Sequence, residues 1–346
     1  MSGTSKKHCN PLAITIGDPA GIGPDIILSS WHRGQREPLH PFLVLGCPET
    51  LERRASVLGM NIPVSVIDKP SDVEQLFSRS LPVFPLEMEN PEVSGKPDAS
   101  SASMTIEAID RAVRWTLSGD TAAVVTAPIN KELLAQKGFS HSGHTEYLAH
   151  LCQKKNGAIP RPVMMLAAPT IRVVPVTVHI PLSEVPAKLS QDLIIETVKI
   201  TENSLRTQFR ISRPRIGITG LNPHAGESGL LGRDEIETVI PAIKTLKKKG
   251  LDVHGPLPAD AAFQKRNRAQ YDVIVAMYHD QALIPVKTIA FDEAVNVTLG
   301  LPIVRTSPDH GTAYDLAGSG KASPESFLAA IKMASDLSGQ NQLEIK

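Results

Sequence analysis

Short apolar runs alternate with longer segments of helical periodicity along most of this chain. Runs rich in valine and isoleucine, of the length of buried strands, occupy residues 12–16, 42–45, 64–67, 122–126, 163–167, 171–178, 216–219 and 273–277. Residues 105–117 place Ile106, Ile109 and Val113 on one helical face, and residues 193–205, 233–246 and 323–333 have the same period. Strands and helices that alternate in this way predict an α/β architecture with a largely parallel sheet.

The length of the chain allows more than one core. A single core stops growing at about 250–300 residues, and this chain has 346. Residues 82–103 are rich in proline and small side chains, and we expect them to form an exposed connection or a covering loop. The sequence contains no internal repeat and no low-complexity tract.

Composition narrows the class of protein. Lysine plus arginine and aspartate plus glutamate both number 36, so the formal charge is zero, and aromatic residues make up 4% of the chain. A nucleic-acid binder would show a basic stripe, and often aromatic side chains for base stacking. This chain shows neither feature, so we do not expect it to bind nucleic acid. Cys9, Cys47 and Cys152 are scattered without a CxxC spacing, which favours a reducing compartment. Without a signal peptide or an apolar run near the roughly 20 residues of a membrane helix, we expect a soluble, cytoplasmic protein.

A glycine-rich loop, GDPAGIGPD at residues 17–25, follows the first predicted strand. Gly21 and Gly23 permit a tight turn, and Pro24 suits the first position of a helix. The dinucleotide fingerprint GxGxxG is not met, because Ile26 stands where the third glycine would be. The loop is therefore either a plain strand-to-helix turn or an anion site at a helix start, with Asp18 at the strand end as a functional residue.

Three histidines share one setting at the ends of predicted strands. They are His179, His224 and His279. The carboxyl edge of a parallel sheet is where α/β proteins gather their ligands, and three neutral imidazoles can hold a divalent ion while leaving positions open. Each histidine alone fits a hydrogen-bonded structural role, but the shared setting favours a metal site.

Two further segments carry polar side chains near predicted helix starts or strand ends. In HSGHTEYLAHL, either Ser142 or Thr145 could cap the following helix, or His144 and Thr145 could bind a substrate anion at its start. The segment TAPINKELL offers Asn130 and Lys131 in a similar place. Both segments are compatible with an anion site and with ordinary capping.

Residues 271–320 combine a buried strand with an unusual series of polar residues. The strand ends in His279 and Asp280, and Lys287, Asn296 and Arg305 follow at nearly regular spacing. A histidine–aspartate pair followed by a cation, an amide and a guanidinium predicts a metal or proton-transfer centre beside an anion pocket.

Several motifs, taken together and in order, resemble one enzyme family. They are GDPAGIGPD, TAPINK, GHTEYLA, VTVHIPL, GLNPHAGESG, GPLPAD, MYHDQALIPVK and VNVTLGLPIVRTSPDHGTAYDLAG, and they span residue 12 to about residue 332. The set is similar to that of the 4-hydroxythreonine-4-phosphate dehydrogenases, NAD-dependent enzymes of vitamin B6 (pyridoxine 5′-phosphate) biosynthesis. The resemblance implies the isopropylmalate dehydrogenase-like α/β/α fold, with two lobes and a cleft between them, and not a Rossmann fold. We expect residues 11–130 with 300–346 to form one lobe and residues 131–299 the other.

The same resemblance implies roles for residues of this chain. It implies one divalent metal ion held by His179, His224 and His279, at a homodimer interface with ligands drawn from both subunits. It implies substrate contacts at His144, Thr145, Lys287, Asn296 and Arg305. NAD, or NADP, is expected to contact His310, Gly311, Thr312, Asp315, Leu316 and Ala317, because DHGTAYDLAGSGKASP is similar to the adenosine-binding loop of isopropylmalate dehydrogenase.

The implied reaction is an oxidation followed by loss of CO₂. A metal ion (Zn²⁺, Mg²⁺ or Co²⁺) would lower the pKa of the C3 hydroxyl of 4-phosphooxy-L-threonine, and Asp280 or Lys287 would remove its proton. C3 would give a hydride to NAD, and the product 2-amino-3-oxo-4-(phosphonooxy)butanoate would decarboxylate to 3-amino-2-oxopropyl phosphate.

Some positions depart from the family pattern. Ala261 stands where threonine is common, and Asp292 and Glu293 stand where glycine and arginine are frequent. These differences leave open a related branch that oxidises D-threonate or D-erythronate 4-phosphate in sugar-acid catabolism. A non-catalytic protein that binds phosphorylated metabolites is an alternative of another class.

Overall fold

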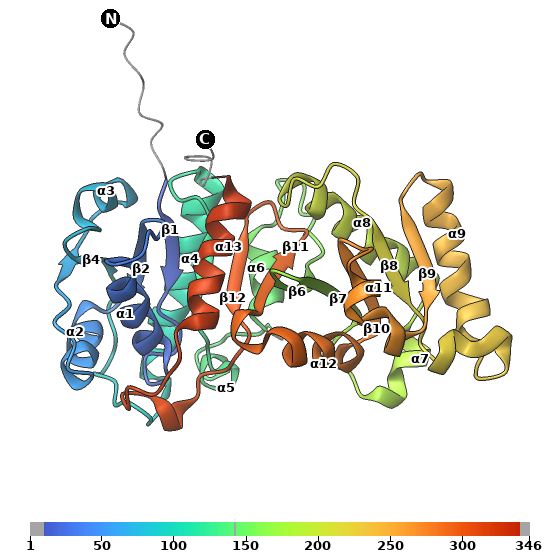
Figure 1. Cartoon of the computed structure of the whole chain (residues 1–346). Coiled ribbons are helices and arrows are strands. Elements are labelled where there is room, and N and C mark those ends of the chain that lie inside the picture. The colour runs from blue at the N-terminus through green and yellow to red at the C-terminus, as the bar shows by residue number, and fades with distance from the viewer. Residues whose placement is uncertain (1–9, 142, 340–346) are drawn as a thin grey trace, which may run out of the picture. The chain divides into compact units, whose positions relative to one another are not determined.

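The computed structural model describes residues 10–141 and 143–339, so His8, Cys9 and Ser142 lie outside the described residues. The chain divides into two compact units, residues 1–160 with 301–346 (unit 1) and residues 161–300 (unit 2). Residues 131–160 therefore belong with the first unit, whereas the sequence placed them in the second lobe. Each unit contains strands and helices of its own (Figure 1).

Unit 1 is built on a parallel sheet with the strand order β3-β4-β2-β1-β5-β12. Every residue of β1, β2, β5 and β12 is buried. Helix α4 packs on β1 and β2, and α13 packs on β12 and β5. The strands are β1 (Leu12–Thr15), β2 (Phe42–Gly46), β3 (Val64–Val66), β4 (Leu81–Pro85), β5 (Val124–Thr126) and β12 (Arg305–Pro308). The helices are α1 (Gly23–Gly34), α2 (Pro48–Val57), α3 (Val73–Leu76), α4 (Ala102–Ser118), α5 (Lys131–Ala135), α6 (His144–Leu151) and α13 (Glu325–Ser338).

Unit 2 has a mixed sheet with the order β11-β6-β7-β10-β8-β9. Strands β7, β10, β8 and β9 run parallel, and β6 is antiparallel to both β7 and β11. Helix α12 packs on β7 and β10 and buries Leu283 and Val286 against the sheet. The strands are β6 (Val163–Ala168), β7 (Ile171–Thr177), β8 (Ile216–Thr219), β9 (Val253–Leu257), β10 (Val273–Tyr278) and β11 (Val295–Leu299). The helices are α7 (Val185–Lys188), α8 (Gln191–Thr207), α9 (Ile240–Lys248), α10 (Ala259–Ala262), α11 (Lys265–Arg268) and α12 (His279–Ala290).

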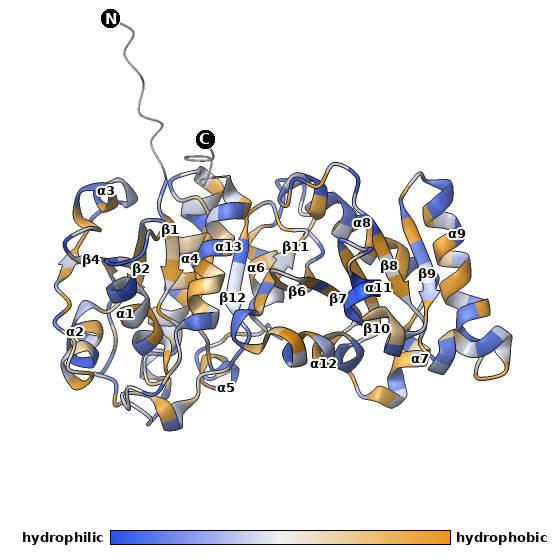
Figure 2. Ribbon diagram, viewed as in Figure 1, coloured by the Kyte–Doolittle hydropathy of each residue, from blue (hydrophilic) through white to orange (hydrophobic). Residues whose placement is uncertain are grey.

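The hydrophobic pattern predicted most of these elements. Apolar residues concentrate on the strands and on the inward faces of the helices (Figure 2). The α/β class is confirmed, and each predicted strand and helix lies within a few residues of an observed one. Within the described part of the chain, no helix is long and apolar enough to cross a membrane.

The prediction of a loop over residues 82–103 is wrong at its start. Strand β4 lies between β3 and β2 and buries Leu81 and Val83. The sequence did not predict this strand because it contains Pro82 and Pro85, and proline is normally confined to sheet edges. Strand β12 was missed for another reason, since its buried positions are Arg305, a threonine, a serine and a proline, and not aliphatic residues.

The predicted helix over residues 233–246 is divided. Residues Glu235–Val239 form a π-helical turn, and α9 continues from Ile240 with Pro241 in its first turn. π-turns often occur at functional sites, and this one follows the segment that carries His224.

Candidate active site

Two of the predicted metal ligands lie side by side in unit 2. His179 follows β7 and His279 begins α12, directly after β10, and their ring centroids are 5.8 Å apart. Strands β7 and β10 are parallel neighbours, which is why their carboxyl ends bring the two rings together. Both residues line a pocket of about 210 Å³.

The backbone and a neighbouring carboxylate orient these rings. His179 has φ 51°, a left-handed conformation that a non-glycine residue adopts at a cost. The Nδ1–H of His279 donates to Asp280 Oδ1 over 2.7 Å. This contact leaves Nε2 as the atom of His279 that is available to a ligand.

His224 lies in a left-handed turn after β8. Residues 224–228 all have positive φ (52°, 53°, 77°, 40° and 57°), although only Gly226 among them is a glycine. The buried carboxylate of Glu235 holds the entry to this turn. Its Oε1 accepts from the N–H groups of Leu221 and Asn222, both at 2.8 Å, and its Oε2 accepts from Asn222 Nδ2 at 3.0 Å.

The three histidines do not meet within one chain. Over residues 10–141 and 143–339, no three His, Cys, Asp or Glu side chains are grouped so that they could hold a metal ion. The ligand set of His179, His224 and His279 therefore stays a prediction, with two of its members paired. The two remaining unit 2 candidates are Lys287 on α12 and Asn296 on β11. Asn296 Oδ1 is covered and makes no hydrogen bond to any described residue.

Unit 1 carries a group of basic side chains near the end of β5. Arg305, the first residue of β12, is 3% exposed and donates from Nη2 to Thr126 Oγ1 at 2.6 Å. Burial lowers the pKa of Arg305 to about 10, so the guanidinium is still charged at neutral pH. His144 begins α6 with Thr145 beside it. Burial, and then the charges of Arg305 and Lys131, lower the pKa of His144 well below its usual value.

This group can accept an anion. His144 is neutral at pH 7, and its covered Nε2 atom has no hydrogen-bond partner among the described residues. A buried polar atom without a partner is costly, and a bound ligand oxygen would remove that cost. The neighbouring residue Asn130 caps α5 by accepting from the N–H groups of Glu132 and Leu133.

The glycine loop packs closely against neighbouring segments, and several of its N–H groups donate hydrogen bonds within the protein. Those of Asp18 and Ile22 donate to the carbonyls of Pro128 (2.8 Å) and Thr312 (2.9 Å), and that of Ala20 to the Asp18 carboxylate. A Cβ on Gly21 would lie 2.7 Å from the Thr312 oxygen, so glycine permits the close approach. These contacts support the tight turn predicted from the sequence, and the anion site at the helix start stays a prediction.

The predicted cofactor segment follows β12. His310 and Gly311 come first, Thr312 contacts the glycine loop, and Asp315 and Leu316 belong to a 3₁₀ turn (Tyr314–Leu316) that ends before Ala317. Tyr314 Oη donates to Asp18 at 2.5 Å and accepts from Asn130 Nδ2 at 2.9 Å. Burial raises the pKa of Asp18, and burial with the Asp18 contact raises the pKa of Tyr314 to about 12.

Sequence reasoning missed four charged or polar residues that shape these sites. Arg54, Asp25 and Tyr314 hold the loops of unit 1, and Glu235 holds the turn of His224. Asp25 and Tyr314 lie inside the recognised motifs, which was the available signal. Arg54 and Glu235 lie on helical segments with nothing to separate them from surface residues.

The comparisons with known proteins decide the family. The family model described as "Pyridoxal phosphate biosynthetic protein PdxA" matches residues 38–334. The chain belongs to this family. Among curated relatives, the 4-hydroxythreonine-4-phosphate dehydrogenase of Methylorubrum extorquens is 50% identical over 94% of this chain and 93% of its own. The enzyme of the same name from Bradyrhizobium diazoefficiens is 48% identical over 94% and 96%.

Solved structures of the same family, and of another dehydrogenase, have a similar fold. The 4-hydroxythreonine-4-phosphate dehydrogenase of Klebsiella pneumoniae is 38% identical with a TM-score of 0.84, covering 95% of this chain and 99% of that one. A terephthalate 1,2-cis-dihydrodiol dehydrogenase from Burkholderia xenovorans is 27% identical with a TM-score of 0.63, over 95% and 98%. The PdxA match includes parts of both units, and both groups of candidate site residues fall inside it.

Proposed function

We propose that this protein is a dehydrogenase of pyridoxal phosphate biosynthesis that oxidises 4-phosphooxy-L-threonine at C3 with NAD. The observation that carries the proposal is the 50% identity to a 4-hydroxythreonine-4-phosphate dehydrogenase over nearly the whole of both chains. NADP is the alternative cofactor. The oxidised product would lose CO₂ to give 3-amino-2-oxopropyl phosphate.

The basic group of unit 1 supports a phosphorylated substrate. Arg305 provides a buried, charged guanidinium, whose paired donors suit phosphate oxygens. His144 would offer its unpartnered Nε2, and Thr145 its hydroxyl, at the start of α6. Lys287 and Asn296 of unit 2 are also proposed substrate contacts, and the covered Oδ1 atom of Asn296 can accept a hydrogen bond from a substrate hydroxyl or amino group.

The donor chemistry of His179 and His279 suits a divalent metal ion. The two rings line one pocket, and Asp280 fixes the tautomer that presents Nε2 of His279. A bound ion would act as a Lewis acid on the substrate hydroxyl. Asp280 or Lys287 would then take the proton of that hydroxyl. His224 would be the third ligand, and we propose that a homodimer supplies it from the second copy.

The segment after β12 suits a dinucleotide. Asp315 and Gly311 are exposed, and a carboxylate in such a segment can accept hydrogen bonds from ribose hydroxyls. Cytoplasmic localisation goes with this role in metabolism.

The test is a comparison of substrates. Full-length protein, incubated with NAD and a divalent metal, should form NADH with 4-phosphooxy-L-threonine at a kcat/KM at least about tenfold above that with D-threonate or D-erythronate 4-phosphate. The reverse order would replace the proposal with the sugar-acid branch. Tight binding of these acids without any NADH would favour a non-catalytic binding protein.

A further inference from the structure

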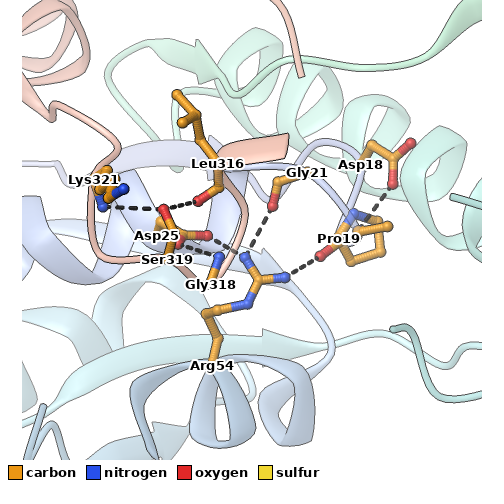
Figure 3. A network of polar contacts seen from close by, with 10 residues as sticks. Asp18, Pro19, Gly21, Asp25, Arg54, Leu316, Gly318, Ser319 and Lys321 are labelled. Atoms are coloured by element: carbon orange, nitrogen blue, oxygen red, sulfur yellow. Dashed lines mark hydrogen bonds and ion pairs between the residues drawn. The ribbon is translucent and has the colours of Figure 1, made fainter. Parts of the chain in front are cut away.

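Arg54 on α2 is a fully buried cation in unit 1. Its side chain is 0% exposed, and its guanidinium forms an ion pair with the equally buried Asp25. Nη1 also donates to the Gly21 carbonyl at 2.9 Å, and Nη2 to the Pro19 carbonyl at 3.0 Å (Figure 3). One side chain therefore holds two carbonyls of the glycine loop and the carboxylate of Asp25, the last residue of that loop.

The glycine loop in turn holds both ends of a later segment, residues 312–318. At one end, Ile22 N–H donates to the Thr312 carbonyl at 2.9 Å. At the other end, Asp25 Oδ1 accepts from Gly318 N–H at 2.8 Å. The Gly318 nitrogen and the Arg54 guanidinium contact the two oxygens of the same carboxylate, Oδ1 and Oδ2 (Figure 3). The position of residues 312–318 therefore depends on Arg54 through the loop and through Asp25.

The segment is fixed from within the protein while part of it stays open. Gly318 has φ 73°, which suits glycine at the point where its N–H turns toward Asp25. The Ser319 hydroxyl donates to the Leu316 carbonyl at 2.6 Å and closes the turn. Asp315, within the same turn, is exposed.

We propose that Arg54 is a positioning residue for nicotinamide-dinucleotide binding. It acts through the glycine loop on residues 312–318 and does not touch the nucleotide itself. The inference rests on the proposed function only in placing the dinucleotide at this segment. A buried ion pair is a poor source of stability, since an apolar pair of similar volume often does as well. Its better use is to fix one geometry, and the fork of arginine donors reaches three acceptors at once.

The main test replaces Arg54 by lysine. Arg54→Lys keeps the charge beside Asp25, but one ammonium cannot reach the Asp25, Pro19 and Gly21 oxygens in the same geometry. We expect the Kd for NADH, titrated by fluorescence on the full-length protein, to rise about tenfold to a hundredfold, the usual scale for loss of such supporting contacts. The KM for the phosphorylated substrate at saturating NAD should stay within about twofold.

The neighbouring arginine provides a matched control. Arg53 is half-exposed on the same helix and pairs with Glu92. Arg53→Lys should leave the Kd for NADH unchanged, because the hydrogen bonds of Arg53 go to Thr50 and Glu92 and not to the glycine loop or Asp25. If Arg53→Lys raised the Kd for NADH as much as Arg54→Lys does, the positioning role could not be assigned to Arg54.

A second variant leaves every charge in place. The added Cβ of Gly21→Ala would press on the Thr312 oxygen at 2.7 Å, and Gly21 has no left-handed φ that would forbid alanine. Gly21→Ala should raise the Kd for NADH and leave the KM for the substrate unchanged, as Arg54→Lys should. If the lysine variant fails to fold, Gly21→Ala alone tests the positioning role. Unchanged NADH affinity in the folded variants, or an equal loss for NADH and substrate, would refute the positioning role.

The outcomes also separate this inference from the proposed function. If the wild-type protein binds NADH but oxidises no phosphorylated threonine, the proposed function fails and the role of Arg54 is still tested by the two variants. If the wild-type protein binds neither NADH nor NADPH, the positioning role is overturned.

Discussion

Two loops in this chain are each held by one buried charged side chain, and the two charges are opposite. In unit 1, Arg54 collects the carbonyl oxygens of Pro19 and Gly21. In unit 2, Glu235 collects the N–H groups of Leu221 and Asn222. The sign of each buried charge follows from the backbone groups that face it. Carbonyl oxygens can only accept and therefore face an arginine, whereas N–H groups can only donate and therefore face a carboxylate.

The two loops differ in how much backbone strain the buried charge has to offset. The glycine loop of unit 1 uses glycine for close packing, with Gly17 alone at positive φ among its glycines. The turn of His224 runs left-handed through five residues, of which four are not glycine. Each of those costs roughly 1–2 kcal/mol, so Glu235 and the surrounding contacts hold a strained backbone. Loss of Glu235 should therefore be more damaging than loss of one contact in the glycine loop.

The largest expected effect comes from removing the carboxylate of Glu235. Glu235→Ala leaves the backbone N–H groups of Leu221 and Asn222 without their acceptor, each costing about 1–3 kcal/mol, whereas Asn222 Nδ2 keeps its bond to Asp234. We expect the free energy of unfolding, from urea denaturation monitored by circular dichroism, to fall by about 3–5 kcal/mol. The exposed Glu237, which pairs with Arg233 one turn away, is the control, and Glu237→Ala should cost less than about 0.5 kcal/mol. Equal losses in the two variants would show that the buried Glu235 carboxylate does not hold the turn of His224.

A smaller effect is expected from adding one methyl group to the left-handed turn. Gly226 has φ 77°, and its added Cβ would lie 2.4 Å from Glu235 Oε2. Gly226→Ala should lower the free energy of unfolding by about 2–4 kcal/mol, from backbone strain plus overpacking. Gly59→Ala, at φ 66° with nothing within 4 Å, carries the strain without the collision. The difference between the two glycine variants measures how closely Glu235 packs against the turn.

The smallest effect concerns Asp18, because burial raises the pKa of its carboxyl above the usual value. The folded state therefore binds this proton more tightly than the unfolded state does. Protonated Asp18 therefore stabilises the folded state. This stabilisation is complete at pH values below the pKa of Asp18 in the unfolded chain, and it is lost as the pH rises through the pKa of Asp18 in the folded protein. Asp18→Asn, which cannot ionise, should gain stability relative to the wild type as the pH rises through that window. Urea denaturation at a series of pH values would measure the difference, and a pH-independent difference would contradict the raised pKa. Asp292→Asn, on an exposed side chain, is the control.

The sequence predicted the fold better than it predicted the contacts of the site. Apolar runs located β1, β2, β7 and β10 because buried parallel strands leave a strong hydrophobic signal. Strand β11 alternates valines with polar residues in VNVTL and could have been found by its period of two. Strand β12 could not, because Arg305 occupies a buried position that a hydrophobic pattern would give to an aliphatic residue.

Within the site, strand ends were a sound guide for two histidines and an incomplete one for the third. His179 and His279 follow strands that are parallel neighbours, so the sheet itself brings them together. His224 follows β8, which also pairs with β10, but a left-handed turn carries it beyond the strand end. A turn of that kind has no hydrophobic period, and local sequence does not predict it.

The sequence alone determined the alternation of strands and helices, the family motifs and the residue types available for chemistry. Tertiary structure decided which charges are buried. Arg53 and Arg54 are neighbours, and Glu235 and Glu237 are two residues apart, yet in each pair one side chain is buried and the other exposed. Successive helical residues point about 100° apart, so the face that meets a loop, and hence the residue that holds it, is set by packing with distant segments.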